Sequence, residues 1–342
     1  MKHLTVLSAG LAALGLLAAC NKTQTEAPAA EPLRLVVDVV DGTTRATGVV
    51  SNSAESEAKV NDLQVFVFNG NVLDGYGHSS NKTTATVSCT AGSRDIYAVV
   101  NGGDLTAIST KSELLSTVAS LSTNIANFQM IGNTTKTLKQ DSAIAIQVHR
   151  LAARVVLKGV KNALTNAAQA GSFSLKAVYL TNVAGDINWG ESSTYAVSHW
   201  YNKRGYQASN NLSNLTYDSV NQAVASGASH TTAHYFYAMP NSAAAAVGGV
   251  WSPRATKLVI RCEIAGNLYD YPITLPALES NKSYEIELVT ITRPGNLDDG
   301  TEPDDSHPDD TDEEKPVVGF DQNFSITVTN WTVVPVTEGT TI

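Results

Sequence analysis

The sequence has few charged, aromatic and sulfur-containing residues. Of its 342 residues, 16% are charged and 7% are aromatic, and it contains three cysteines and three methionines. The net charge of −9 and the lack of clustered Lys and Arg exclude a nucleic-acid partner, because neutralising phosphates requires such clusters. The hydrophobic fraction of 43% nevertheless predicts a folded chain of about two domains.

The acidic residues are concentrated in one place. Ten carboxylates and no Lys or Arg lie between Asp298 and Glu314, so the net charge of −9 would be +1 without them. Because like charges repel and Pro303 and Pro308 interrupt regular pairing, residues 295–316 are predicted to form a solvated acidic linker. The spacing of a calcium-binding EF-hand loop is absent, so no metal is expected there.

The first twenty residues indicate export. Lys2 precedes an apolar run that ends in Leu-Ala-Ala-Cys at Cys20, a length typical of a signal peptide. These last four residues are typical of a bacterial lipobox, in which residues 1–19 are removed and Cys20 is lipidated. Residues 21–32 would then be a flexible tether. Ordinary secretion with an incidental cysteine is the alternative.

Short β-type runs separated by turn residues dominate the rest of the chain. They occur at 63–68, 96–100, 144–148, 153–160, 173–180, 258–264 and 284–291. Turns are predicted at Asn69-Gly70 and Ala265-Gly266. This spacing favours a mainly β fold of antiparallel β-sandwiches. A helix is expected at 112–121 with Ser112 as its cap, and a shorter one at 161–170.

The two remaining cysteines are predicted to be buried. Cys89 and Cys262 each share the inward face of an alternating strand with aliphatic residues. They are expected in different domains, so no disulfide between them is predicted.

The motifs of common enzymes are missing. The chain contains no nucleophile elbow, phosphate loop, HExxH motif or paired cysteine motif, so no enzyme and no cofactor are expected. His230 and His234 are four residues apart in a β-type run, which would separate them by about 13 Å and disfavours a metal site.

A half-buried strand is predicted near the N-terminus. Leu33, Leu35, Val37 and Val39 share one face of it. A polar turn follows, and a cut after Arg45, before Ala46, would detach this strand covalently from the body.

A second strand is predicted near the C-terminus, beyond the acidic linker. Phe324, Ile326 and Val328 share a face, and Trp331 and Val333 follow in shifted phase. A releasable first strand and a reaching last strand would allow polymerisation by strand addition between copies. In the alternative, residues 33–40 are a permanent edge strand and residues 324–336 simply close the second sandwich.

Several segments in order resemble one family. They are the lipobox at Cys20, the Arg45-Ala46 junction, VFVFN at 65–69, YAVVN at 97–101, HRLAARVVL from His149, TRPG at 292–295 and the strand with Trp331. Together the chain resembles a fimbrillin of type V pili, and most of all the shaft subunit of minor-type fimbriae.

This resemblance implies a lipoprotein precursor with two transthyretin-like β-sandwich domains, at 46–155 and 156–342. Residues 20–45 would be a propeptide that an Arg-specific, gingipain-like protease removes at the outer membrane. Residues 317–342 would donate a strand to another copy in a surface fimbrium that supports adhesion, with tip and anchor subunits as further partners.

Two other functions remain open. A tip adhesin or glycan-binding surface lipoprotein is suggested by Trp189, Trp200, Tyr201 and Tyr206, which lie in a polar stretch and could stack on sugars if exposed. An anchor subunit would keep its lipid and would not be cleaved.

Overall fold

The computed structural model describes residues 32–41, 57–125, 127–244, 251–298, 300, 313–315, 317 and 326–331. The described residues form one compact unit. The predicted lipid site at Cys20, the Arg45-Ala46 junction, Phe324 and Val333 lie outside the described residues.

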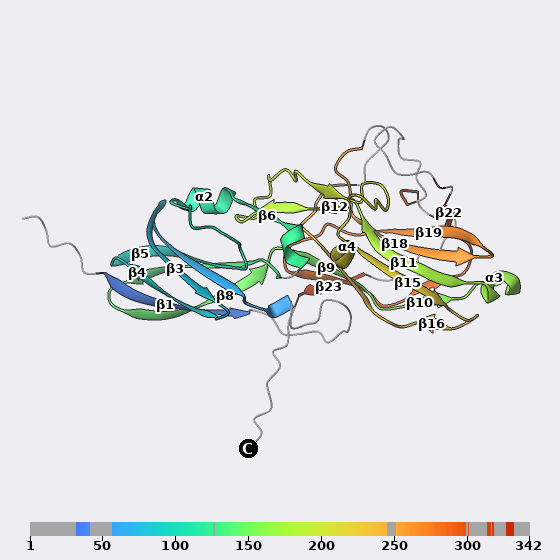
Figure 1. Ribbon diagram of the computed structural model, residues 1–342, viewed down its shortest axis with the longest axis horizontal. Helices are drawn as coiled ribbons and strands as arrows, with labels where there is room; N and C mark the ends of the chain where they lie inside the picture. The colour runs from blue at the N-terminus through green and yellow to red at the C-terminus, as the bar shows by residue number, and fades with distance from the viewer. Residues whose placement is uncertain are drawn as a thin grey trace, which may run out of the picture. The chain divides into compact units, whose positions relative to one another are not determined.

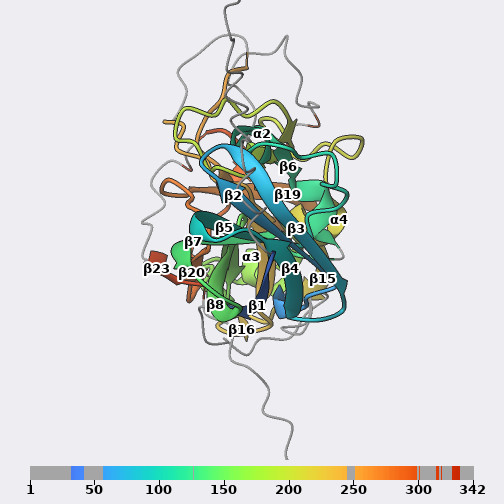
Figure 2. The same ribbon diagram turned by 90° about the vertical axis from the view of Figure 1, so that its left-hand side faces the viewer.

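The first β-sandwich contains seven strands in the order β3-β2-β5-β7-β8-β1-β4 (Figures 1 and 2). Their bounds are β1 Leu33–Asp41, β2 Asp62–Asn69, β3 Val72–Ser80, β4 Thr84–Cys89, β5 Gly92–Val100, β7 Met130–Leu138 and β8 Ser142–Arg150. β7 and β8 pair only at Met130 and Ile131, so this is the corner between two layers. One layer is β3-β2-β5-β7, and the other is β8-β1-β4.

Alternation of apolar and polar residues places the core between these layers. β4 shows it most clearly, because Ala85, Val87 and Cys89 are buried and the residues between them are exposed. β2 is buried on both faces, since Phe66 and Phe68 pack outward against Leu105 and Leu114.

The second β-sandwich has one layer of five strands in the order β15-β11-β18-β19-β22, all of which are labelled in Figure 1. Its strands are β11 Ser174–Thr181, β15 Tyr217–Ala223, β18 Lys257–Ile264, β19 Asn267–Thr274 and β22 Asn296–Leu297.

The facing layer consists of β17-β9-β20-β23 and β16-β10-β21. These two sheets continue one another, because β9 (Ala153–Leu157) precedes β10 (Val160–Asn162), and β20 (Lys282–Ile286) precedes β21 (Val289–Ile291). The other strands are β16 Ser229–His230, β17 His234–Ala238 and β23 Ile326–Asn330. Short pairings join β6 (Val118–Ser120) to β13 (Asp186–Asn188) and β12 (Val183–Ala184) to β14 (Trp200–Tyr201).

The predicted mainly β class with few short helices is confirmed. Both predicted hairpins also form: β2 turns into β3 through Gly70, and β18 turns into β19 through Ala265 and Gly266. Gly70 has φ 62° and Gly266 has φ 81°, a backbone region that favours glycine.

The predicted helices are shorter than expected. α2 spans Lys111–Ser116, and its cap is Thr110 rather than Ser112. The Thr110 hydroxyl accepts a hydrogen bond from the Glu113 N–H, and the Glu113 carboxylate accepts one from the Thr110 N–H, which is a capping box. The chain then enters β6 and a 3₁₀ turn at Leu121–Ile125.

The second predicted helix begins later than expected, because residues 160–162 pair as β10. α3 spans Ala167–Gly171 and is capped by Asn166. A further short helix, α4, spans Ser213–Thr216.

Both remaining cysteines are buried, as predicted. Cys89 belongs to the core of the first sandwich and Cys262 to that of the second. Burial raises the pKa of both thiols, so both are poor nucleophiles at neutral pH.

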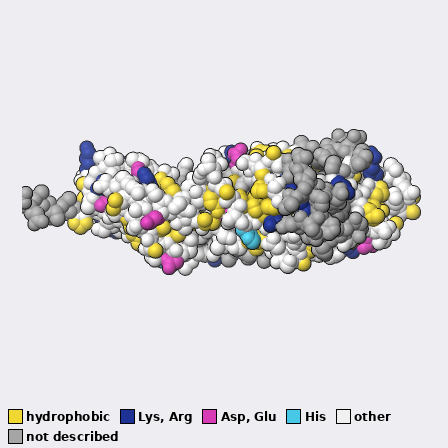
Figure 3. Space-filling view, turned by 90° about the horizontal axis from the view of Figure 1, so that it is seen from above, with side chains coloured by type: hydrophobic (Ala, Val, Ile, Leu, Met, Phe, Trp, Pro, Cys, Tyr) yellow, Lys and Arg dark blue, Asp and Glu magenta, His cyan; other side chains and the backbone are white. Residues whose placement is uncertain are grey.

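Charged side chains on the face in Figure 3 are sparse and scattered among its described atoms.

The predicted separation of His230 and His234 is wrong. The chain turns between β16 and β17, which brings the two Nε2 atoms to 2.9 Å. The rings differ by 18° in plane and their centroids lie 5.1 Å apart, so they meet end to end. His234 Nδ1 also lies 2.7 Å from the Asp218 carboxylate on β15, in the facing layer. This end-to-end contact is that of an N–H···N hydrogen bond rather than of two ligands converging on a metal.

This pair predicts a loss of stability in mild acid. Burial and then the neighbouring His234 lower the pKa of His230, whereas Asp218 opposes this. The unfolded chain takes up a proton at His230 below about pH 6.5 that the folded chain resists, so stability should fall as the pH drops through that value. Urea unfolding at several pH values measures this, and His230→Gln should flatten the profile. The exposed His199→Gln is the control, and an unchanged profile in His230→Gln contradicts the assignment.

Candidate functional site

β1 is an inner strand of the first sandwich. It pairs antiparallel with β4, from Leu33 opposite Cys89 to Asp38 opposite Thr84. It pairs parallel with β8, from Leu35 opposite Ser142 to Asp41 opposite Val148. The alternative in which β1 is an edge strand is therefore wrong, and its loss would leave a groove between β4 and β8.

The inward face of β1 fills this groove. Leu35, Val37 and Val39 are buried in the core of the first sandwich, and Leu33 is half-buried against it. Each fully buried aliphatic side chain stabilises the folded state by about 1.5–3 kcal/mol. Residues on the outer face bond locally: Asp38 accepts a hydrogen bond from Thr84 Oγ1 at 3.0 Å. The predicted face of Leu33, Leu35, Val37 and Val39 is thus the face that points inward.

β23 occupies the edge of the second sandwich and contributes little buried surface. It pairs antiparallel with β20, from Ile326 opposite Ile286 to Asn330 opposite Lys282. Ile326 is half-buried, whereas Val328 is 49% exposed. Ile326 and Val328 therefore do not share a buried face here, and backbone pairing is the main contact of this strand.

Trp331, directly after β23, is completely buried. Its ring stacks on Tyr237 at 5.4 Å between centroids and meets Phe128 edge-on at 5.3 Å. The guanidinium groups of Arg150 and Arg154 lie 4.9 and 5.3 Å from the centre of the indole ring, within cation–π range. The backbone N–H of Trp331 donates a hydrogen bond to the Asn281 carbonyl at 2.8 Å.

Glu57 completes this Trp331 cluster, which we define as Glu57, Phe128, Arg150, Arg154, Tyr237 and Trp331. The buried Glu57 carboxylate accepts hydrogen bonds from Tyr237 Oη at 2.6 Å and Trp331 Nε1 at 3.0 Å, and lies 3.3 Å from Arg154 Nη1. Its backbone carbonyl accepts a hydrogen bond from Arg150 Nε at 2.9 Å. Burial raises the pKa of Tyr237 well above its ordinary value, and the Glu57 charge adds to this.

The Trp331 cluster lies at the end of the strand that flanks β1. Arg150 is the last residue of β8, which pairs with β1 along most of its length. Glu57 is the first described residue after the 42–56 segment that joins β1 to the body. Sequence reasoning missed Glu57, Arg150 and Arg154, although two arginines in the apolar run HRLAARVVL are a signal of a buried charge network.

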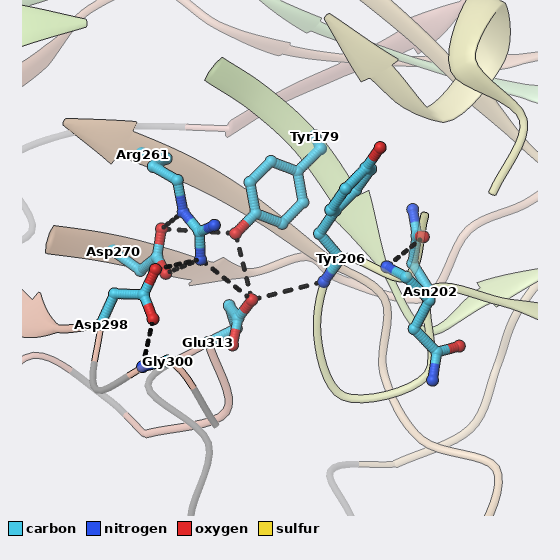
Figure 4. Close-up of polar contacts among 9 residues, drawn as sticks. Tyr179, Asn202, Tyr206, Arg261, Asp270, Asp298, Gly300 and Glu313 are labelled. Carbon is cyan, nitrogen blue, oxygen red and sulfur yellow. Dashed lines mark hydrogen bonds and ion pairs between the residues drawn. The ribbon is translucent and has the colours of Figure 1, made fainter. Parts of the chain in front are cut away.

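The end of the acidic segment is docked rather than solvated, which corrects the linker prediction for these residues (Figure 4). Glu313 is 3% exposed and accepts hydrogen bonds from Tyr179 Oη at 3.2 Å and the Tyr206 N–H at 3.3 Å. Glu314 forms an ion pair with Lys257 at 2.8 Å.

Arg261 is the centre of this contact. Its Nε and Nη2 atoms donate hydrogen bonds to the two carboxylate oxygens of the fully buried Asp270, at 2.9 and 2.6 Å. Nη2 also lies 3.4 Å from the carboxylates of both Glu313 and Asp298. Burial alone would lower the pKa of Arg261, but its hydrogen bond to Asp270 and the neighbouring carboxylates raise it. These contacts of Arg261, together with those of Glu313 and Glu314, therefore fix residues 313–315 onto the five-stranded layer.

The aromatic residues that suggested a glycan platform are mostly inside. Trp189, Trp200 and Tyr201 are buried, and Tyr206 is half-buried beside Tyr179 and Tyr217. This removes the observation that motivated sugar stacking.

A cavity of about 550 Å³ lies beside the end of β23. Its walls include His149, Glu191, Lys282 and Asn330. His149 Nε2 lies 2.5 Å from the Glu191 carboxylate, and Lys282 Nζ donates to Asn330 Oδ1 at 2.8 Å. Several of its polar groups are therefore paired with one another.

Among the residues that the structure describes, no three His, Cys, Asp or Glu side chains are placed to share a metal ion. No helix in the same part of the chain is long and apolar enough to cross a membrane.

The match to a known family covers the region around β1. Residues 32–175 match the model of the family described as "Major fimbrial subunit protein (FimA)". This range contains all seven strands of the first sandwich and the start of the second. The predicted resemblance to fimbrillins is thus confirmed, and no curated protein sequence matches the chain.

Solved structures with the same fold extend the likeness to most of the chain. A protein from Bacteroides eggerthii, described as a candidate cell adhesion protein, is 20% identical with a TM-score of 0.66, covering 90% of this chain and 98% of that one. The fimbrilin FimA of Porphyromonas gingivalis is 16% identical with a TM-score of 0.64, covering 89% and 99%. The tip fimbrial protein Mfa3 of the same species, with a C-terminal truncation, is 15% identical with a TM-score of 0.51, covering 88% and 100%. At these identities, the likeness shows a shared fold.

The Trp331 cluster predicts a strong dependence of stability on one side chain. Trp331→Ala should lower the free energy of unfolding by about 3–5 kcal/mol, because it leaves a cavity and removes a partner of the buried Glu57 charge. Trp331→Phe keeps most of the ring but loses the bond to Glu57, so a smaller loss of about 1–3 kcal/mol is expected. Urea unfolding measures both. Val328→Ala, at an exposed position three residues earlier, is the control, and an equal effect of Trp331→Ala and Val328→Ala contradicts the role of the cluster.

Proposed function

We propose that this protein is the shaft subunit of a surface fimbrium, exported as a lipoprotein and polymerised by strand exchange after cleavage at Arg45. The observation that carries the proposal is the position of β1, an inner strand whose apolar face completes the core of the first sandwich. The match of residues 32–175 to a fimbrial subunit family supports it.

The connectivity explains why a cut near Arg45 would matter. Arg45 lies in the 42–56 segment that joins β1 to the body. A cut there leaves β1 held only by non-covalent contacts. When β1 leaves, β4 and β8 each lose a row of backbone partners and the core loses three buried side chains. A strand from a second copy would restore both.

The donor in this proposal is the C-terminal segment 317–342, including Phe324, Ile326, Val328, Trp331 and Val333. β23 is held in its own sheet mainly by backbone pairing, which an exchange would replace by equivalent pairing. Trp331 is the strongest hold on the segment, since its ring is fully buried. Residues 332–342 follow this hold, and the rest of the donor segment can exchange only if Trp331 leaves the Trp331 cluster.

The partners follow from the same assembly. They are other copies of this chain, accessory tip and anchor subunits, and an Arg-specific, gingipain-like protease. Before cleavage, Cys20 would attach the precursor to the outer membrane through its lipid. No nucleic acid, cofactor or catalytic role is part of the proposal.

Cleavage is tested by changing Arg45. Arg45→Ala precursor treated with an Arg-specific protease should stay monomeric, whereas the wild type should give a ladder of multimers on a gel, because β1 is released only after the cut. Arg293→Ala, at an exposed arginine away from both chain ends, is the control and should behave like the wild type. Normal ladders from Arg45→Ala would show that cleavage at this residue is not required.

The donor is tested by two truncations. A chain ending at Trp331 keeps Phe324, Ile326, Val328 and Trp331 and should be cleaved but extend a filament less well than the full chain. A chain ending at Pro316 lacks the whole donor and should be cleaved but unable to extend. Electron microscopy and gel ladders of the cleaved proteins measure this. Undiminished extension by the first truncation alone would place the donor strand within 317–331. Extension by both would refute a C-terminal donor.

The competing functions predict a different mature N-terminus. Sequencing the surface-exposed protein should find Ala46 for a polymerised subunit and lipidated Cys20 for an anchor or an uncleaved lipoprotein. The cavity beside β23 is the remaining candidate pocket for a glycan-binding role. Binding to a glycan array by a protein that does not enter filaments would favour that role.

A further inference from the structure

The outer wall of the groove is β4, which has backbone pairing with one strand only among the described strands. β4 ends the strand order of the first sandwich and pairs only with β1 among the described strands. When β1 leaves, β4 loses all of its inter-strand backbone hydrogen bonds. A groove can receive a new strand only if β4 stays in place, so something other than β1 must hold it.

β3 lies against β4 at very short range. A Cβ atom added at Gly75 would lie only 2.4 Å from the Ser88 carbonyl oxygen, and one at Gly77 only 2.5 Å from the Thr86 carbonyl oxygen. Any side chain at these two positions would push β4 away. Because β3 has glycine at both, its backbone rests directly on the backbone of β4, with Val87 between the two contact points.

Side chains fasten β3 to both ends of β4. At one end, the Asp74 carboxylate accepts hydrogen bonds from the Thr90 N–H and hydroxyl, both at 2.8 Å, and from Arg94 Nε at 2.8 Å. Arg94 also donates to the Ala91 carbonyl at 2.7 Å. At the other end, the Ser79 hydroxyl donates to the Thr84 carbonyl at 2.9 Å.

The Asp74–Arg94 pair is sheltered from water. The two side chains are 12% and 5% exposed. Burial alone would raise the pKa of Asp74, but the Thr90 N–H and Arg94 outweigh burial and lower it. The carboxylate is therefore charged at neutral pH, and its charge-assisted hydrogen bonds are of the stronger kind.

We propose that β3 is a brace that keeps the groove open after β1 has left, with Asp74, Arg94, Gly75 and Gly77 as its positioning residues. The occupant of the groove is a strand from a second copy, so this inference rests on the proposed function. In the precursor β1 also holds β4, and the brace is then one of two supports. After cleavage and release of β1 it is the support that keeps β4 from collapsing toward β8 or fraying.

The test compares the protein before and after cleavage. The probe is a fluorescent synthetic peptide with the sequence of residues 33–41. It is added in excess to full-length protein that an Arg-specific protease has cut, after the protease has been inhibited, because the peptide itself contains Arg34. Asp74→Asn should reduce the fraction of protein that binds the peptide at least about tenfold, because it removes the charge that strengthens the hydrogen bonds from Thr90 and Arg94. Before cleavage, amide hydrogen exchange of β4 in Asp74→Asn should remain close to that of the wild type.

Asp95→Asn is the matched control. Asp95 lies next to Arg94 on β5 and pairs with Lys111 at 2.7 Å, but that pair is more exposed and does not touch β4. Its effect on uptake should stay within about twofold, as is usual for a surface ion pair. Thr90→Val is a milder second variant, which keeps the Asp74–Arg94 pair and removes the hydroxyl bonds to it. Thr90→Val should reduce peptide binding less than Asp74→Asn does. If Asp74→Asn fails to fold, Thr90→Val still tests the brace.

The outcomes separate the two proposals. If cleaved wild type takes up no peptide, the groove of the proposed function is absent. If the wild type takes up peptide and folded Asp74→Asn and Thr90→Val take it up equally well, the brace is overturned. If β4 in uncleaved Asp74→Asn already exchanges as fast as in the cleaved variant, the brace supports the whole sandwich rather than the open groove, and the inference is also wrong.

Discussion

The burial of one strand between β4 and β8 is the constraint on which the first sandwich depends. β1 supplies three buried side chains to the core. It is also the only strand that pairs with β4 among the described strands. It is also the strand nearest to the N-terminus in the described chain and is joined to the body through a single segment, 42–56. A strand that is central in the sheet and terminal in the chain is structurally essential but easy to detach.

β8 links this strand to the other end of the chain. It pairs with β1 and ends at Arg150, whose guanidinium lies over Trp331. After Leu151 and Ala152, the chain continues as β9, which pairs with β20, the partner of β23. The groove that would receive a strand and the anchor of the segment that would supply one are therefore built on consecutive strands, β8 and β9.

The sequence predicts local features better than pairings between distant segments. The alternation in β1 and β4, both hairpins and the burial of Cys89 follow from residues close together in the chain. The contact of His230 with His234 depends on a turn that the spacing rule for one strand ignores. The burial of Trp331 depends on Glu57, which is 274 positions away. Docking of Glu313 depends on Arg261 and Tyr179, whereas its composition alone indicates a solvated segment.

The 42–56 segment also sets a competition between strands. While it is intact, it holds β1 close to the groove, so under the proposed exchange a donor from another copy, which must arrive by diffusion, would compete poorly. Any cut within the segment removes this advantage without changing a single contact of β1 in the groove. Once dissociated, β1 is diluted into the surroundings, whereas neighbouring copies concentrated on one surface are not. Proteolysis would then direct assembly through entropy alone, and the density of subunits would decide which strand wins.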